Sequence, residues 1–376
     1  MANHLQFIAH RKACFVGVKK AAIIQARVGS SRFANKIFCN LAGKPMMWHI
    51  LERLDRCRTL DLIAIATTTL KEDDPVVEFA DSQGVEAFRG SQDDVQRRYL
   101  DAALFFGAEI IVRVTADAPL VDPDMIDRLV DITDRLNLDY AITNPKIPAA
   151  QEGFEVLRTS ALIRSRRISD APKHREHVTL HIRENLALFK SAFLNPDSAL
   201  RGEGYRLSVD TYTDYLFMDE IYKRLYRPGS IVDLKEVVRL LNSDPEIKRI
   251  NAHIKQKPTE KPSALVAFVL DDEILCKTKS NLLNLCQTLT DHLHFGVGIC
   301  CIGSQNIPED ILTRGYRTAI LPEKADDKIH TILTEWNPST VIVSNQFFNL
   351  GKNHFIKSRI LSYETTFHEI LNALMT

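Results

Sequence analysis

The sequence predicts an α/β protein whose first domain carries a largely parallel sheet and whose second domain is smaller. Short apolar runs alternate with segments of helical periodicity, which is the pattern of a parallel sheet covered by helices. A polar stretch with two prolines, 250–262, interrupts this alternation, which then resumes. Such a stretch is typical of a linker between domains. At 376 residues, 45% of them hydrophobic and 26% charged, the chain is long enough for two globular domains.

The strands expected in the first domain are short apolar runs of the kind that is buried on both faces of a sheet. They cover 22–24, 62–67, 85–88, 110–114, 140–142 and 206–211. Apolar residues at helical spacing predict helices over 46–54, 75–84, 93–107 and 215–226, with a further helix starting at Asp122. In such sheets ligands bind beyond the carboxyl ends of the strands, so the residues that follow these runs are the candidate site.

The second domain repeats the pattern on a smaller scale. Strands are expected at 264–270, 296–302, 317–321, 340–344 and in a last region at 356–363. Helices are expected at 279–293, 307–315 and 328–336. The order is that of a second α/β unit with parallel strands.

A basic loop directly follows the first strand. Within ten residues it carries Arg27, Arg32 and Lys36, cations that suit a polyphosphate, and Gly29, which lets the backbone approach a ligand closely. A strand that runs into such a loop and then into a helix commonly holds nucleotide phosphates. The loop has no G-x-x-x-x-G-K-[ST] motif. The competing interpretation is a solvated charged loop.

Two aspartates follow predicted strands. Asp117 comes after the run 110–114 and Asp210 lies at the end of 206–211. Two carboxylates at strand ends could chelate Mg²⁺ together with a triphosphate. The alternative role of a strand-end aspartate is to cap a helix. We assign capping to Asp122, which precedes a proline, and metal binding to Asp117 and Asp210.

These motifs resemble the signature of the sugar-activating cytidylyltransferases. The matching strings are Gln25-Ala26-Arg27, Ser31-Arg32, Lys36, Gly43-Lys44-Pro45 and the spaced set Arg113, Thr115, Asp117 and Pro119. The closest resemblance is to the SpsF-like branch of spore-coat polysaccharide biosynthesis. That branch is related to the enzymes that attach CMP to sialic, pseudaminic, legionaminic and 3-deoxy-octulosonic acids. The resemblance implies a nucleotide-diphospho-sugar transferase-like (GT-A/Rossmann-like) fold, with CTP as substrate, Mg²⁺ as cofactor and pyrophosphate as product.

The resemblance also implies roles for single residues. Catalytic roles fall on Arg27, Lys36, Asp117 and Asp210, of which the two aspartates bind the metal. The nucleotide-binding residues that it implies are Gln25, Ala26, Arg27, Gly29, Ser31, Arg32, Lys36, Thr67, Arg89, Gly90, Asp93 and Thr115. On the sugar side it implies Glu155, Glu176 and His177.

The string Glu176-His177-Val178-Thr179 bears on the oligomeric state. In relatives it belongs to an arm that crosses a dimer partner and shapes the sugar pocket, so a homodimer is expected. His177 is a candidate general base. A polar cluster at a helix N-terminus is the equal alternative.

Three departures from the family pattern leave a second function open. Ala34 stands in place of the usual proline, Ala118 in place of the usual cysteine, and the stretch 152–156 is shortened. The alternative is therefore a non-catalytic nucleotide-sugar sensor or scaffold of a polysaccharide pathway. A glycosyltransferase would need a D-x-D metal motif, and Asp122-Pro-Asp124 is better explained by capping.

The domain boundaries predicted from these patterns are an N-terminal extension at 1–20, the nucleotidyltransferase domain at 21–251, a linker at 252–263 and the small α/β domain at 264–376. The last is faintly similar to half of a nucleotide-sugar hydrolase or of a GT-B glycosyltransferase. Its Gly-x-Gly-His motif is absent, because Asp271-Asp272-Glu273-Ile274 stands there. We predict a non-catalytic domain for binding, docking or dimer support.

The composition limits which binding partners and which cellular compartment are expected. Lys+Arg and Asp+Glu both total 48, so no global charge indicates binding to nucleic acid or to a membrane surface. No apolar run reaches the about 18 residues that cross a bilayer, and the N-terminus does not resemble a signal peptide. Seven scattered cysteines fit reduced thiols. A cytoplasmic protein is expected.

Overall fold

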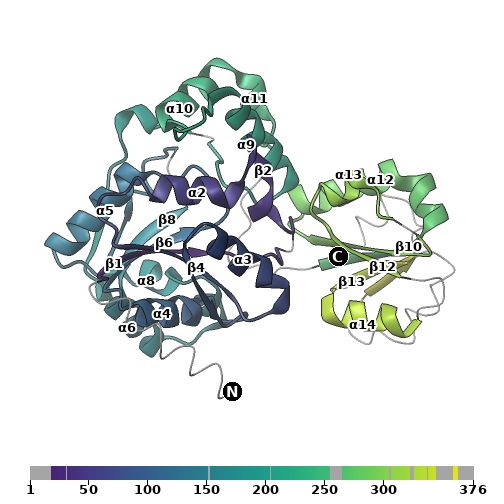
Figure 1. The fold of residues 1–376 in the computed structure, drawn as a ribbon, viewed down its shortest axis with the longest axis horizontal. Helices are drawn as coiled ribbons and strands as arrows, with labels where there is room; N and C mark the ends of the chain where they lie inside the picture. Colours follow the sequence, from purple (N-terminus) through teal and green to yellow (C-terminus); the bar gives the residue numbers. More distant parts are fainter. Residues whose placement is uncertain are drawn as a thin grey trace. The chain divides into compact units, whose positions relative to one another are not determined.

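The computed structural model describes residues 18–30, 32–150, 153–203, 205–254, 265–304, 306–321, 326–336, 338–343 and 359–362. Most of the predicted N-terminal extension and linker lie outside these residues. The chain forms two compact units. The first unit comprises residues up to Gly29, Ile37–Val209 and Asp214–Ile250, and the second comprises Ser30–Lys36, Asp210–Thr213 and the chain from Asn251 onward (Figure 1).

The first unit is built on a seven-stranded sheet in the order β5-β4-β1-β6-β8-β7-β9. Its strands are β1 (Lys20–Gln25), β4 (Leu62–Thr68), β5 (Glu86–Gly90), β6 (Ile110–Thr115), β7 (Tyr140–Thr143), β8 (Phe154–Arg158) and β9 (Ser191–Leu194). β1 pairs in parallel with β4 and β6, and β4 with β5. Only β8 runs antiparallel to its neighbours, β6 and β7. The predicted mostly parallel α/β fold is confirmed.

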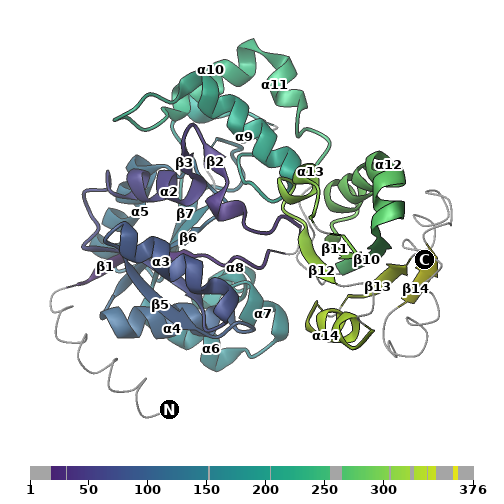
Figure 2. The ribbon, with the colours of Figure 1, turned by 45° about the vertical axis from the view of Figure 1, so that its right-hand side comes forward.

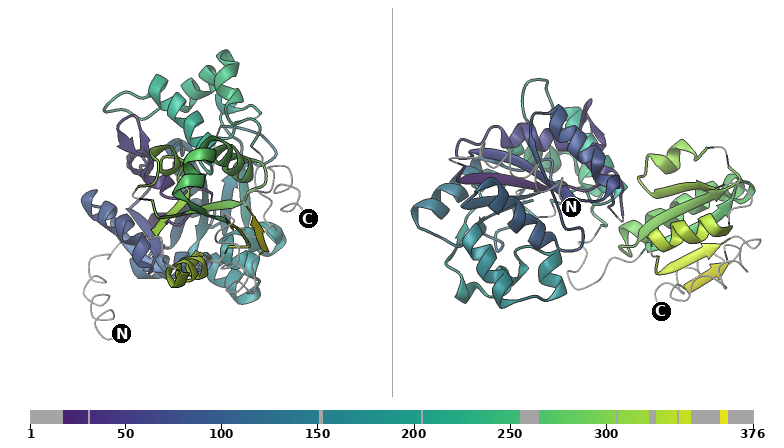
Figure 3. Two further views of the ribbon diagram at one scale, coloured as in Figure 1. Left: turned by 90° about the vertical axis from the view of Figure 1, so that its right-hand side faces the viewer. Right: turned by 60° about the horizontal axis from the view of Figure 1, so that its bottom comes forward.

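Alternate residues of β1 enter two different cores, which is why this strand is apolar throughout. Ala22 and Ile24 face one core with apolar residues of α2 (Met46–Leu54), α3 (Asp74–Ser82) and α5 (Pro123–Arg135). Ala21 and Ile23 face the other core with residues of α4 (Val95–Phe106) and α6 (Thr159–Ile168). Helices therefore cover both faces of the sheet (Figures 1 and 3).

The remaining helices, a hairpin and single 3₁₀ turns complete this part of the chain. The hairpin strands are β2 (Asn40–Leu41) and β3 (Lys44–Pro45), and the remaining helices are α7 (Pro172–Glu176), α8 (Leu180–Glu184), α9 (Tyr212–Leu225), α10 (Leu234–Ser243) and α11 (Pro245–Arg249). Single 3₁₀ turns are η2 (Lys36–Phe38), η3 (Lys71–Asp73), η4 (Leu186–Leu188) and η5 (Ser198–Leu200). No helix among the described residues combines the length and apolar character needed to cross a membrane.

The second unit has its own parallel sheet in the order β12-β11-β10-β13-β14. The strands are β10 (Leu265–Asp271), β11 (Gly296–Ile302), β12 (Arg317–Leu321), β13 (Thr340–Val343) and β14 (Arg359–Ser362). One face packs on α12 (Asp272–Asp291) and α13 (Glu309–Leu312), the other on α14 (Asp326–Trp336) (Figure 2). The predicted second α/β region is thus present.

The predicted strand at 206–211 is wrong, because residues 205–210 are irregular. Contacts other than the hydrogen bonds of a β-sheet hold the backbone of these residues. The guanidinium of Arg206 binds both carboxylate oxygens of the fully buried Asp214, at 2.9 and 3.1 Å, and so ties the two ends of the segment together. The N–H of Val209 donates to the carbonyl of Asp117 at 2.7 Å. Asp210 therefore lies in a clamped loop and not at a strand end.

Two predicted helices of the second unit also differ from the structure. α12 begins at Asp272, seven residues before the predicted start, because the side chain of Asp271 caps it by accepting the N–H of Ile274 at 2.8 Å. The helix expected at 307–315 is reduced to α13, whose last turn ends before the left-handed Gly315.

A buried charge pair joins β6 to β8 where the sheet changes from parallel to antiparallel. Arg113 and Glu155 are opposite residues in the register, and their side chains form an ion pair at 2.8 Å. Glu155 is 5% exposed. Its carboxylate also accepts the hydroxyls of Tyr140, at 2.6 Å, and of Thr179, at 2.7 Å. The pair thus connects β6, β7, β8 and the segment after α7.

Burial alone would raise the pKa of the Glu155 carboxyl. The charges of Arg113 and Arg183 and the two hydroxyl donors outweigh burial, so this pKa lies below its ordinary value. Because the folded pKa lies below the unfolded value, the ionised carboxylate stabilises the fold above about pH 4.3. This contribution disappears as the pH falls through the folded pKa.

We predict that Glu155→Gln lowers the free energy of unfolding at pH 7 by about 3 to 5 kcal/mol, because Arg113 is left buried without its counter-charge. The difference from the wild type should shrink as the pH falls below about 4. Urea denaturation, followed by circular dichroism at pH 7 and again below about pH 4, measures this difference in the free energy of unfolding. Glu220→Gln, at a surface pair on α9, is the control and should change little. A pH-independent difference would contradict the prediction.

Candidate nucleotide site

The predicted nucleotide-binding residues of the first unit gather at the carboxyl ends of four neighbouring strands. The register places Gln25 opposite both Ala66 and Thr115, and Thr67 opposite Arg89. Ala26 directly follows β1, and Gly90 ends β5. The structure therefore brings Gln25, Ala26, Thr67, Gly90 and Thr115 to one edge of the sheet, as the parallel topology requires.

Arg27 leaves this edge with an exposed side chain. It forms no ion pair with any described residue. The loop behind it is held by Asp73, which is fully buried and accepts the N–H of Val28 at 2.7 Å and the hydroxyl of Thr68. An anchored backbone beside an uncommitted guanidinium is suited to bind an anionic ligand.

The side chain of Arg89 is bound by other residues of the first unit. Its guanidinium donates to the carbonyls of Thr68 and Leu70, at 2.9 and 2.5 Å, and pairs with Asp74 at 2.6 Å. It thereby holds the segment that follows β4. Its predicted role at the base and ribose stays a prediction, and Asp93 is exposed at the start of the next helix.

Arg98 is a candidate that sequence reasoning did not assign. It is 2% exposed, and its Nη1 donates to the carbonyl of Ser91 at 2.5 Å. Its Nε has no hydrogen-bond partner among the described residues. Burial lowers the pKa of this guanidinium, and the nearby positive charge of Arg27 lowers it further. A buried, incompletely bonded cation beside Arg27 fits a polyanion.

The sequence offers a weak signal for this residue. Arg97 and Arg98 are consecutive in the first turn of α4, so only one of them can face inward. Arg97 instead pairs with Asp101 one turn later, at 2.7 Å, on the exposed side. Asp94 caps the helix by accepting the N–H of Arg97. Helical spacing therefore indicates that one of the two arginines faces inward, and the structure shows that it is Arg98.

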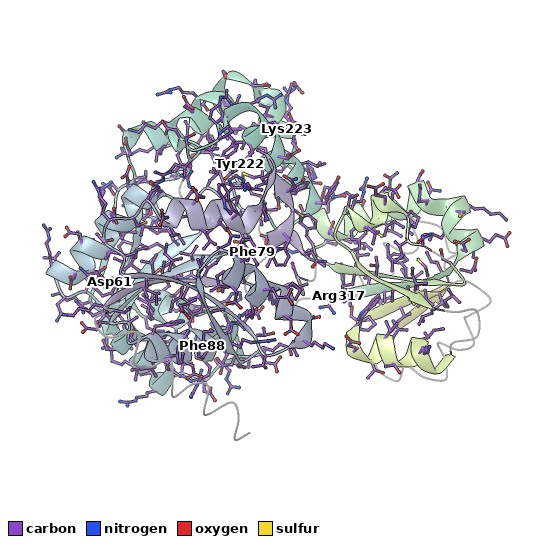
Figure 4. The ribbon with its side chains drawn as sticks, in the orientation of Figure 1. Asp61, Phe79, Phe88, Tyr222, Lys223 and Arg317 are labelled. Carbon is purple, nitrogen blue, oxygen red and sulfur yellow. The ribbon has the colours of Figure 1, made fainter. Side chains whose placement is uncertain are left out.

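The loop that carries Asp117 is closely packed. Gly153 has φ +89°, and a Cβ there would lie 2.1 Å from the Cβ of Ala118, so only glycine fits. Its carbonyl accepts the N–H of Thr115 at 3.0 Å. The hydroxyl of Tyr222 donates to the carbonyl of Pro119 in the same loop at 2.9 Å. Figure 4 labels Tyr222, which belongs to α9. The carboxylate of Asp117 is thus presented by a rigid backbone.

The second unit contains the other predicted carboxylate together with two of the predicted cations. One oxygen of Asp210 is 3.2 Å from Nη2 of Arg32 and 3.1 Å from Nζ of Lys36. The other terminal nitrogen of Arg32, Nη1, is buried and has no partner among the described residues. The Asp210 side chain is 20% exposed. Ser31 lies outside the described residues.

The two predicted metal-binding aspartates have donors of the kind that Mg²⁺ prefers, since this ion takes one or two carboxylates and completes its shell with phosphate oxygens and water. Asp117 belongs to the first unit and Asp210 to the second. No group of three or more His, Cys, Asp or Glu side chains gathers at one point in the described part of the chain. A site shared with a triphosphate does not need such a cage. The orphaned Nη1 of Arg32 likewise fits a phosphate oxygen.

The predicted sugar-side residues differ in their surroundings. Glu155 belongs to the buried pair described above. Glu176 ends α7 with an exposed side chain, and His177 follows it partly buried. The next two residues are anchored in the first unit. The carbonyl of Val178 accepts Nε2 of Gln96 at 3.1 Å, and Thr179 donates to Glu155.

A cavity of about 490 Å³ lies elsewhere in the first unit, at the N-terminal ends of α5 and α10. Its lining includes Arg53, Asp122 and Asp233 but none of the predicted site residues. Both aspartates cap helices, as the sequence predicts for Asp122. The cavity therefore does not extend the nucleotide site.

Similarity to known proteins supports the fold of the first unit. The structure of a cytidylyltransferase from Leptospira borgpetersenii serovar Hardjo-bovis superposes with a TM-score of 0.57 at 29% identity, over 64% of this chain and 99% of that one. Spore coat polysaccharide biosynthesis protein SpsF of Bacillus subtilis is 31% identical over 231 residues, which are 60% of this chain and 94% of that protein.

A more local similarity joins the chain to an enzyme of named substrate. The 3-deoxy-manno-octulosonate cytidylyltransferase of Geobacter sulfurreducens is 38% identical over 116 residues, 29% of this chain and 43% of that protein. The family described as cytidylyltransferase matches residues 21–244, more than half of the chain. With the strand-edge site in place, this match shows that the chain belongs to the cytidylyltransferase family.

Proposed function

We propose that this chain transfers the CMP group of CTP to a hydroxyl of a sugar acid and releases pyrophosphate, for the synthesis of a surface polysaccharide. The observation that carries the proposal is the convergence of Arg32 and Lys36 on one oxygen of Asp210, at 3.2 and 3.1 Å. Two cations beside a partly exposed carboxylate suit a triphosphate with its metal ion. The family supplies the reaction class.

Each charged residue has a distinct part in this reaction. Arg27, Arg32 and Lys36 bind the triphosphate and offset the negative charge that grows on the leaving pyrophosphate. Asp117 and Asp210 would hold Mg²⁺, which when bound neutralises phosphate charge and polarises the α-phosphate. The sugar hydroxyl attacks the α-phosphorus, the bond to the β-phosphate oxygen breaks, and the hydroxyl proton is lost to a base. The residues of this chain chiefly position the two reactants.

The acceptor is proposed from two relatives. One is named for spore coat polysaccharide biosynthesis and the other for 3-deoxy-manno-octulosonate, a sugar acid. The exposed Glu176 and the partly buried His177 are proposed to face this sugar. We also propose that the chain works as a homodimer, with His177 as general base.

The sensor or scaffold function is less well supported, because two of the three departures that favoured it, Ala34 and Ala118, have structural explanations. The N–H of Ala34 donates to the carbonyl of Gly315 at 2.5 Å, and proline has no N–H to donate. Ala118 has its Cβ against Gly153, where a larger residue would need space. Neither departure removes a proposed metal ligand or phosphate contact.

We predict that Asp117→Asn and Asp210→Asn each lower pyrophosphate release by about a hundredfold or more, the scale of one lost electrostatic contact in a transition state. The assay contains Mg²⁺, CTP and a panel of sialic, pseudaminic, legionaminic and 3-deoxy-octulosonic acids. Asp131→Asn, at an exposed pair on α5, is the matched control and should retain activity.

The outcomes separate the candidate functions. Release that requires CTP and one sugar acid, and that fails in both variants, supports the enzyme. If no acid of the panel leads to pyrophosphate release but CTP binds tightly in a calorimetric titration, the sensor function is supported. Absence of CTP binding contradicts both functions.

A second prediction concerns Arg98. Arg98→Met should raise the KM for CTP by about 10- to 100-fold, the effect of losing a hydrogen bond to a charged group. Arg97→Met, which alters the exposed neighbour, should leave this KM within about twofold. Steady-state kinetics with CTP varied at saturating sugar measure the difference, and circular dichroism checks that both variants fold. Equal KM values would show that Arg98 has only a structural role.

A further inference from the structure

We propose that Gly315, Arg314 and Gln287 of the second unit are positioning residues for the cluster of Arg32, Lys36 and Asp210. This inference rests on the proposed function, because that cluster is the proposed triphosphate site. All of the contacts that carry it lie within the second unit, to which 30–36 and 210–213 belong. The positioning residues themselves follow much later in the chain, in α12 and before β12.

The first contact holds the residues that directly follow Arg32. Phe33 is fully buried, and a Cβ added at Gly315 would lie 2.2 Å from its ring. The same Cβ would lie 2.6 Å from the carbonyl oxygen of Ala34. The N–H of Ala34 in turn donates to the carbonyl of Gly315 at 2.5 Å. Gly315 has φ +64°, so its backbone also requires glycine.

The second contact holds the residues that follow Asp210. The hydroxyl of Thr213 donates to Oδ2 of Asp291 at 2.8 Å and accepts Nε2 of Gln287 at 2.8 Å. Asp291 is 2% exposed, so this hydrogen-bonded group is shielded from water. Gln287 and Asp291 lie one turn apart on α12.

Arg314 joins the two contacts. Its Nη1 donates to Oε1 of Gln287 at 2.9 Å, and its guanidinium lies 5.4 Å from the centre of the Tyr212 ring. That ring meets Phe33 edge-on, with centroids 6.0 Å apart. One connected set of contacts therefore fixes the chain on the C-terminal side of both Arg32 and Asp210. A shift of this set would change where the cations and the carboxylate are held.

The test compares variants of the full chain in their affinity for CTP with Mg²⁺, measured by calorimetry. Gly315→Ala should raise the Kd by about 2- to 30-fold, the range found for residues that act without touching a ligand. Gly84→Ala is the matched control. It has nearly the same φ, +66°, but a Cβ there meets nothing within 4 Å, so its Kd should stay within about twofold of the wild type.

A second pair of variants covers the case in which Gly315→Ala does not fold. Gln287→Ala removes the donor to Thr213 and the acceptor of Arg314, whereas Asn284→Ala alters an exposed residue one turn earlier on α12.

Where sugar turnover is measurable, Gln287→Ala should raise the KM for CTP and leave the KM for the sugar unchanged. A merely structural role would lower the melting temperature without separating the two KM values. A Kd for Gln287→Ala equal to that of Asn284→Ala, in folded protein, would overturn the inference.

Inorganic tripolyphosphate separates this inference from the proposed function. If the wild type fails to bind CTP but binds tripolyphosphate, and Gln287→Ala weakens that binding, the positioning role holds while the CTP function fails. If Gln287→Ala binds tripolyphosphate as the wild type does, the positioning role is wrong. If the wild type binds neither compound, both proposals fail.

Discussion

The buried pair of Arg113 and Glu155 is the interaction on which the first unit most depends. It lies between the last parallel strand, β6, and the antiparallel β8, so it fixes how the two parts of the sheet meet. Arg113 also reaches Gln25 at the end of β1, at 3.2 Å, and Glu155 holds Thr179 after α7. The carboxylate of Glu155 also accepts the hydroxyls of Tyr140 and Thr179, whereas Nε of Arg113 is buried without a hydrogen-bond partner among the described residues. The pair lies two residues before the end of β6, close to the strand ends where the candidate nucleotide-binding residues gather.

Buried arginine nitrogens without a hydrogen-bond partner occur in both units of the described chain. In the first unit they include Nε of Arg98 and of Arg113, and in the second unit Nη1 of Arg32. Such orphaned donors cost stability in the absence of a ligand, which is acceptable where a ligand supplies the missing acceptors. Asp210 is held between two cations, Arg32 and Lys36, within the second unit. The proposed function assigns the missing acceptors to phosphate oxygens of the nucleotide.

The family match covers residues 21–244, so the α/β region that begins with β10 lies outside it. The Gly-x-Gly-His motif is absent from this region, yet its residues contact the segments next to Arg32 and Asp210 within the second unit. Ala34 is part of this arrangement, because its N–H is bonded to Gly315. In the proposed positioning role, this region influences nucleotide binding through the segments that carry Arg32 and Asp210.

The sequence by itself determined the fold class, the parallel strand edge and the family, because apolar periodicity and short polar motifs report local burial and local hydrogen bonding. Strands such as Gly296–Ile302 and Arg317–Leu321 have the predicted bounds. Only the tertiary structure decided that Asp210 lies in a clamped loop, that Arg98 faces inward, and that Gly315 packs on Phe33. These features depend on residues far apart in the chain, such as Lys36 and Asp210, which are separated by 174 positions. Pairings over such distances leave no periodic trace in a single sequence, since they form only when the surrounding elements have packed.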